Sequence, residues 1–316
     1  MTRTVQLIGA PMDYGADRRG VDMGPSAIRY ADLATELSDA GVEAVDTGDL
    51  SMPRAEERDP GNESAKFLPE IEDLCGRLAD EVEEAIAADR VPLVLGGDHA
   101  VAIGSMAGSA RDADIGVVWF DAHGDFNTPE TSPSGNVHGM PLAAALGEGS
   151  FADHPWATAP GLKEENIAYV GLRTLDDHER EAIQDSDMTA FTMSEIDERG
   201  ITDVTEEALD VASAGVDGVH VSFDMDWLDP EEAPGVGTPV RGGATYREAH
   251  TALETVAERD ADEEILRSME IVEVNPILDQ SNRTADIAAE LAASALGKRV
   301  LYNAGRASRR RKRGEQ

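Results

Sequence analysis

Residues 115–125 read IGVVWFDAHGD, and this stretch carries the clearest fold signal in the chain. Apolar residues rich in β-branched and aromatic types run directly into Asp121, His123 and Asp125. An apolar run without clean alternation is typical of a parallel strand that is buried on both faces. Alternate residues at the end of an extended strand point the same way, so the three polar side chains are expected on one side.

Similar runs occur along the rest of the chain: VQLIGA from Val5, VPLVLGG from Val91, IAYVGLR from Ile167, VHVSFDMD from Val219 and SMEIVEVNP from Ser268. Helical patterns lie between them, at residues 24–41, 68–86, 246–259 and 284–296. Alternating strands and helices predict a parallel sheet covered on both faces. We therefore predict an α/β protein, a single three-layer α/β/α domain with a mostly parallel central sheet, over residues 1–305.

The composition is strongly acidic. The chain has 63 acidic and 27 basic residues among 316, a formal net charge of −36. An acidic partner-binding surface and adaptation to a salty cytoplasm both fit; the even spread of the acidic residues favours the halophilic interpretation. Such a charge predicts a salt requirement for folding. It also argues against nucleic-acid binding by the main domain, because phosphate repels an acidic surface.

The C-terminal segment, residues 306–316, reads RASRRRKRGEQ and has the opposite charge. It is predicted to be a solvated, disordered tail; the alternative is a tail that pairs with an acidic neighbouring subunit or with nucleic acid. The chain has one cysteine, Cys75, which leaves no intramolecular disulfide. No apolar run is long enough for a membrane span and no signal peptide is evident, so a cytoplasmic protein is expected.

Polar clusters follow four of the predicted strands, and ligands bind beyond the carboxyl ends of strands in open parallel sheets. The carboxylates of Asp121, Asp125, Asp224 and Asp226 would balance two divalent cations, and His99 and His123 would complete a mixed oxygen and nitrogen set. Such a set suits manganese, with cobalt, nickel or iron as competitors. A pair of ions is a known means of generating a nucleophile from water at neutral pH.

Taken together, these clusters resemble the ureohydrolases, the arginase–agmatinase family, over almost the whole chain. The matching strings are GGDH at 96–99, DAHGD at 121–125, SFDMDWLDP at 222–230, GTPV at 237–240 and EVNP at 273–276. The resemblance implies two Mn²⁺ per subunit, bridged by Asp121 and Asp224. His99 and Asp125 would complete one ion, and His123 and Asp226 the other. A hydroxide bridging the ions would attack the guanidinium carbon of the substrate.

The resemblance also implies further roles. Asp125 would orient the hydroxide, His138 would carry a proton to the leaving amine, and Glu273 and Thr238 would line the guanidinium end of the pocket. The loop SGNVHG at 134–139 matches the arginase form, which predicts hydrolysis of L-arginine to L-ornithine and urea. The α-carboxylate of the substrate would be held by neutral donors, namely Asn127, Ser132, Ser134 and Asn136. The α-amino group would be held by the acidic residues Asp176 and Glu179.

Two positions depart from the family pattern: Gly124 stands where Thr is frequent, and Trp227 where arginases usually have glycine. Trp227 is expected to narrow or reshape the pocket. The alternatives are an agmatinase or another guanidino-compound hydrolase, and a catalytically idle, metal-binding regulatory homologue. The family suggests a homotrimer or homohexamer.

Overall fold

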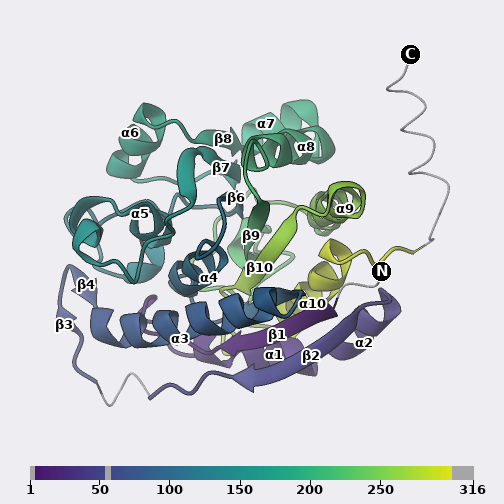
Figure 1. Cartoon of the computed structure of the whole chain (residues 1–316), viewed down its shortest axis with the longest axis horizontal. Helices are drawn as coiled ribbons and strands as arrows, with labels where there is room; N and C mark the ends of the chain where they lie inside the picture. The colour runs from purple at the N-terminus through teal and green to yellow at the C-terminus, as the bar shows by residue number, and fades with distance from the viewer. Residues whose placement is uncertain (1–3, 54–57, 301–316) are drawn as a thin grey trace.

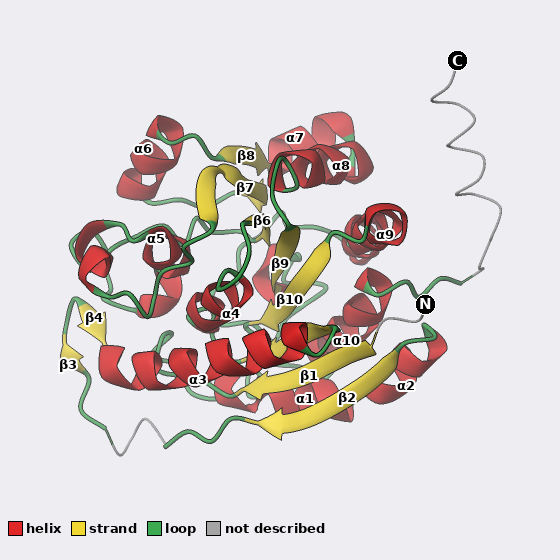
Figure 2. Cartoon of the chain, viewed as in Figure 1, coloured by secondary structure: helices red, strands yellow, loops and turns green. Residues whose placement is uncertain are grey.

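The computed structural model describes residues 4–53 and 58–300. Its centre is an eight-stranded, entirely parallel sheet in the order β2-β1-β5-β10-β9-β6-β7-β8 (Figure 2). The strands are β1 (Thr4–Ala10), β2 (Glu43–Asp49), β5 (Arg90–Gly96), β6 (Ile115–Phe120), β7 (Leu162–Leu172), β8 (Thr189–Thr192), β9 (Gly218–Asp224) and β10 (Leu266–Val272). The predicted α/β class and parallel sheet are confirmed, and all six predicted strands are present.

Helices cover both faces of this sheet (Figure 1). The layer against one face consists of α1 (Gly24–Tyr30), α2 (Leu33–Asp39), α7 (Met193–Arg199), α8 (Ile201–Ala212), α9 (Tyr246–Glu263) and α10 (Arg283–Ala295). The opposite layer contains α3 (Leu68–Ala87), α4 (Val101–Ser109), α5 (Pro141–Leu146) and α6 (Asp177–Asp185). Val5 and Leu7 of β1 pack into the first layer and Ile8 into the second, as the alternation of a doubly covered strand requires.

Smaller elements connect these parts. A two-stranded hairpin, β3 (Gly61–Asn62) with β4 (Ala65–Lys66), precedes α3. Short 3₁₀ helices span Val21–Met23, Val137–Gly139, Gly149–Asp153 and Met225–Trp227. Among the described residues, no helix is long and apolar enough to cross a membrane. The proposed basic tail, residues 306–316, lies outside the described residues.

Several features differ from the sequence prediction, and the helices α4 to α8 were not among the predicted ones. The edge strands β2 and β8 were not predicted; β2 reads EAVDTGD, is mostly exposed, and among the described strands pairs with β1 alone. The helix predicted from Gly24 to Gly41 is divided into α1 and α2. The break falls at Asp32, whose φ of 57° is in the left-handed region and cannot continue a right-handed helix. Finally, α9 continues to Glu263 instead of ending at Arg259.

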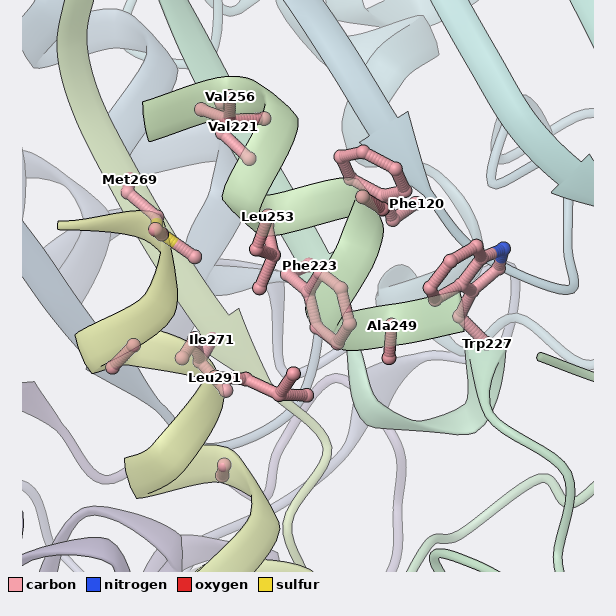
Figure 3. Packing of buried hydrophobic residues seen from close by; sticks show 14 of the residues in the cluster. Phe120, Val221, Phe223, Trp227, Ala249, Leu253, Val256, Met269, Ile271 and Leu291 are labelled. Atoms are coloured by element: carbon pink, nitrogen blue, oxygen red, sulfur yellow. The ribbon is translucent and has the colours of Figure 1, made fainter. Parts of the chain in front are cut away.

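Trp227 belongs to the hydrophobic core between the sheet and α9 (Figure 3). Its ring lies 5.1 Å from that of Phe120 and 5.5 Å from that of Phe223, both in edge-to-face geometry. The side chain is fully buried. A Cβ at Gly171, where φ is 96°, would lie 1.9 Å from the indole nitrogen, so the absence of a side chain at Gly171 makes room for this ring. Trp227 therefore anchors the loop after β9 to the core.

Candidate metal centre

The polar residues predicted for the site come together at the carboxyl ends of the central strands. His99 follows β5, Asp121 follows β6, Asp224 ends β9, and Glu273 follows β10. These four strands are neighbours in the order β5-β10-β9-β6. A cavity of about 120 Å³ opens there and is lined by His123, Asp125, His138, Gly139, Glu179, Asp224, Asp226 and Thr238.

The imidazole of His99 faces three carboxylates. Its Nδ1 lies 3.1 Å from Asp121 Oδ2, 3.0 Å from Asp125 Oδ2 and 3.1 Å from Asp224 Oδ2. All four side chains are buried, with His99 1% exposed. Although three oxygens are this close, Nδ1 makes no hydrogen bond of normal geometry. Several ligand atoms converging on one point, without hydrogen-bond alignment, is the arrangement expected around a cation.

A second group shares Asp121 with the first. Asp121 Oδ1 lies 3.4 Å from His123 Nδ1, and Asp226 Oδ2 lies 3.1 Å from the same nitrogen. Each oxygen of Asp121 thus faces a different imidazole. The candidate ligand atoms of each group, His99–Asp121–Asp125 and Asp121–His123–Asp226, lie within 4.8 Å of one another. This geometry would allow Asp121 to bridge two ions.

Two observations test whether these residues suit divalent cations. The buried atoms His99 Nδ1 and Asp226 Oδ1 have no hydrogen-bond partner among the described residues, and orphaned buried polar atoms are rare unless something binds them. The donor set of carboxylate oxygens and imidazole nitrogens is also the one that manganese and its first-row neighbours accept. The residues therefore fit a site for divalent cations.

The electrostatic field at this point is strongly negative. Burial would lower the pKa of His123, yet Asp226 and Asp121 outweigh that effect and raise it to about 12. Burial and the charge of Asp121 raise the pKa of Asp125 to about 6. Burial and the neighbouring carboxylates likewise raise the pKa of Asp224. Buried carboxylates that repel one another lack solvation by water, so a cation bound between them is favoured.

The backbone of two site residues adopts a conformation uncommon outside glycine. Asp125 has a φ of 48° and Glu273 a φ of 65°. Residues held in this region cost on the order of 1–3 kcal/mol and persist where the surrounding structure fixes them. Glu273 is fixed by its backbone N–H, which donates to the carbonyl of Gly97 at 2.9 Å, and by its Oε1, which accepts from the backbone N–H of His99 at 3.0 Å.

His138 lies beside the cluster, paired with Glu273. Its Nδ1 is 3.1 Å from Glu273 Oε1. Burial alone would lower the pKa of His138, but the hydrogen bond and charge of Glu273 raise it to about 9. Thr238 also lines the cavity and donates its hydroxyl to Asp226 Oδ2 at 2.8 Å. The imidazole of His138 is therefore protonated near neutral pH and can donate that proton.

The loop predicted to bind a carboxylate continues into His138 and Gly139, which line this cavity, but Asn127, Ser132, Ser134 and Asn136 are not among the lining residues. Its side chains make local contacts: Ser132 Oγ accepts from Gly135 N–H at 3.0 Å, and Ser134 Oγ accepts from Asn136 N–H at 3.1 Å. Asn136 donates to the carbonyl of Ala16 at 3.1 Å and accepts from Lys66 Nζ at 3.0 Å. Asn136 is therefore tied to Ala16 and to Lys66 of β4, while Ser134 is exposed.

The acidic residues predicted to hold an amino group form the start of α6. Asp176 Oδ1 accepts from the backbone of Glu179 at 2.8 Å, and Glu179 Oε2 accepts from the backbone of Asp176 at 3.1 Å, a reciprocal capping box. Asn127 Nδ2 donates to Asp176 Oδ2 at 2.8 Å, which joins this helix to the loop at 127–138. Burial, followed by the charge of Asp125, raises the pKa of Glu179 to about 7.

Neither departure from the family pattern removes a candidate ligand. Trp227 points into the core and is absent from the cavity lining, so the expectation that it narrows the pocket is wrong. Gly124 is closely surrounded: a Cβ there would lie 2.9 Å from Leu175 Cδ2 and 3.1 Å from Glu179 Oε1. A larger residue at 124 would therefore push against Glu179, which lines the cavity.

Several residues that shape the site were missed in the sequence. The indole of Trp119 stacks on His99 at 4.2 Å and donates to Asp121 Oδ2 at 3.0 Å. Ser222 lies 2.8 Å from His99 Nε2 and donates to Glu270 at 2.8 Å. Ser222 lies two residues before Asp224 on the same strand face, a spacing that could have revealed it. Nothing in the sequence signals the Trp119 stacking.

The fold and this cluster define an α/β protein with a buried carboxylate–imidazole centre suited to divalent cations. The model of the Arginase family matches residues 3–297, and the chain belongs to that family. Arginase from Bacillus subtilis (strain 168) is 52% identical over 305 residues, which cover 95% of this chain and 100% of the relative. Arginase from Brevibacillus brevis is 48% identical with the same coverage. The chain is therefore an enzyme of the amidinohydrolase class.

Solved structures agree in fold. The native structure of arginase from Bacillus caldovelox superposes with a TM-score of 0.89 at 45% identity, covering 95% of this chain and 100% of that one. Arginase from Entamoeba histolytica, solved in complex with L-ornithine, gives a TM-score of 0.84 at 31% identity, covering 94% and 100% of the two chains. These similarities confirm the predicted family.

Proposed function

We propose that this enzyme hydrolyses L-arginine to L-ornithine and urea, with two Mn²⁺ held by His99, Asp121, His123, Asp125, Asp224 and Asp226. The observation that carries the metal assignment is the convergence of three carboxylates on the unpartnered Nδ1 of His99. The substrate assignment rests on the 52% identical B. subtilis arginase, matched over 95% of this chain. Two ions at this site would lower the pKa of water so that a nucleophile exists near neutral pH.

The residues around the ions then have separate tasks. Asp125 lines the cavity beside His99 and can orient the attacking water and accept its proton. Glu273 is buried at 1% exposure; it is proposed to face the guanidinium end of the substrate while it keeps His138 protonated. His138, charged up to a pH of about 9, can donate a proton to the amine that leaves. Thr238 holds Asp226 in place through its hydroxyl.

Discrimination between arginine and agmatine depends on the α-substituents. Asn127, Ser132, Ser134 and Asn136 are proposed to bind the α-carboxylate, which agmatine lacks. Of these, Ser134 is exposed and the buried Asn127 already bonds to Asp176. Asp176 and Glu179 are proposed to bind the α-amino group. A buried carboxylate such as Glu179 gains most from an ammonium partner, because burial disfavours its charge when it is alone.

The direct test is urea release from L-arginine and from agmatine, measured side by side with manganese-loaded protein in high salt. Activity on arginine alone is the expected result. Activity on agmatine alone would refute the assignment of arginine as the substrate. No activity on any guanidino compound would favour a catalytically idle, metal-binding homologue. The variant His138→Asn should bind the same metal with sharply reduced turnover; unchanged turnover would remove the shuttle role.

Other properties stay predictions. A net charge of −36 supports adaptation to high salt, and it disfavours nucleic-acid binding by the main domain. A homotrimer or homohexamer is proposed for the assembly, to be measured by light scattering in high salt; a monomer at all protein concentrations would contradict it. A cytoplasmic location is likewise a prediction.

A further inference from the structure

A buried polar layer lies behind the metal centre, between α4 and the strands β9 and β10. Its middle member is Glu270, which is fully buried. Glu270 Oε1 accepts from Ser222 Oγ at 2.8 Å and lies 3.4 Å from His220 Nε2, and Oε2 accepts from the hydroxyl of Ser105 on α4. A buried carboxylate is tolerated only when such donors surround it.

This layer touches the metal centre through one hydroxyl. Ser222 Oγ lies 2.8 Å from Nε2 of His99, the ring nitrogen that faces away from the carboxylates. The opposite nitrogen, Nδ1, is the one that lies 3.0–3.1 Å from the three carboxylates. Glu270, Ser222 and His99 therefore form an unbroken path from the interior of the protein to a proposed ligand atom.

The direction of hydrogen bonding along this path is fixed by Glu270. Both oxygens of Glu270 accept hydrogen bonds, Oε1 from the hydroxyl of Ser222 and Oε2 from that of Ser105, as an ionised carboxylate does. The neighbouring His220 also lowers the pKa of Glu270, against the effect of burial. A carboxylate can only accept, so it takes the single hydrogen of the Ser222 hydroxyl. The oxygen of Ser222 is then left to accept a hydrogen from Nε2 of His99. His99 is thereby held as the tautomer whose Nδ1 carries a lone pair.

We propose that Glu270 is a positioning residue for metal binding: acting through Ser222, it fixes the tautomer and the ring orientation of His99 so that Nδ1 is available to a divalent ion. This inference rests on the proposed metal site. Ring rotation is restricted further by Trp119, which stacks on His99 with an interplanar angle of 8°. Partners of this kind are typically worth about 10- to 100-fold in metal affinity.

The same layer contains a branch that does not reach His99. His220 Nδ1 lies 2.7 Å from Ser268 Oγ, and Ser268 in turn bonds to Ser109 of α4. Ser109, like Ser222, is fully buried. Ser109→Ala is therefore a matched control for Ser222→Ala, since both changes remove one buried hydroxyl but only one of them breaks the path to His99.

The experiment measures Mn²⁺ affinity and stoichiometry by calorimetry on metal-free wild type and on Ser222→Ala, Glu270→Gln and Ser109→Ala. The unfolding midpoint of each metal-free protein is measured alongside. Ser222→Ala and Glu270→Gln are expected to weaken one of the two ions by about 10- to 100-fold, and Ser109→Ala is expected to bind as wild type. The visible spectrum of the Co²⁺-loaded protein should change with Ser222→Ala and not with Ser109→Ala.

A wild-type Mn²⁺ affinity in Ser222→Ala, or an equal loss of Mn²⁺ affinity in Ser109→Ala, would overturn the proposed relay from Glu270 through Ser222 to His99. Ser222→Ala is the smaller change and keeps the test decisive if Glu270→Gln does not fold. If the wild type itself binds no divalent ion, the metal assignment fails together with the relay. If the wild type binds two ions and Ser222→Ala binds them with the same affinity, the role of Glu270 and Ser222 is refuted while the metal site stands.

Discussion

Replacing Trp227 with alanine should destabilise the protein strongly without changing substrate specificity. The side chain is fully buried and packs edge-to-face with Phe120 and Phe223. A large aromatic side chain buries up to about 250 Å², which at about 25 cal/mol per Å² sets an upper limit near 6 kcal/mol. Measured truncations of buried aromatics cost about 3–5 kcal/mol, and we expect this range.

The assay is guanidinium chloride unfolding followed by far-UV circular dichroism at constant high salt. The matched control is Trp156→Ala: Trp156 is only partly buried and lies away from the site's cavity lining, so a loss of less than about 2 kcal/mol is expected. The folded Trp227→Ala protein should keep the KM for arginine within about threefold, a change of less than 1 kcal/mol. A tenfold change in KM with unchanged stability would show that Trp227 acts on the pocket after all.

Three further predictions concern charge. Glu273→Gln removes the carboxylate that raises the pKa of His138 to about 9, so the alkaline limb of kcat should move toward the ordinary imidazole pKa of about 6.5; an unmoved limb would contradict the pairing. Lys66→Met removes contacts of 3.0 Å to Asn136 and 3.2 Å to Asp17. It should raise the KM for arginine roughly two- to fivefold with little change in kcat, as expected for partly exposed contacts. The control, Lys163→Met at the far end of β7, should leave the KM unchanged. The unfolding midpoint should rise steeply with KCl because screening relieves the charge of −36; full stability in dilute buffer would refute this.

The sequence was most informative where one physical requirement dominates. Strands buried on both faces are largely apolar, so β5 and β6 were predictable from their apolar runs alone. Candidate ligands were predictable because they follow those strands directly, and parallel strands bring their carboxyl ends to one edge. Which carboxylate faces which imidazole is a matter of side-chain geometry, and the structure alone reveals that each oxygen of Asp121 faces a different ring.

Other features depend on contacts that local sequence does not encode. The edge strand β2 is polar and exposed, so its strand conformation comes from pairing with β1. The break at Asp32 occurs within a sequence that has ordinary helical periodicity. Trp227 is adjacent to a predicted ligand, yet the short helix after β9 turns its ring into the core. The hydrogen bonds of Glu270 to Ser222 and to Ser105 of α4 form only in the folded protein, so local sequence does not reveal them.

The central claim is that turnover of arginine requires two divalent ions at this cluster. The most direct test is a titration of metal-free protein with Mn²⁺ in high salt, in which urea release from L-arginine and bound metal per chain are measured in the same samples. The proposed site predicts no turnover without metal and a plateau at two ions per chain. Full turnover in metal-free protein, or a plateau at one ion, would contradict it.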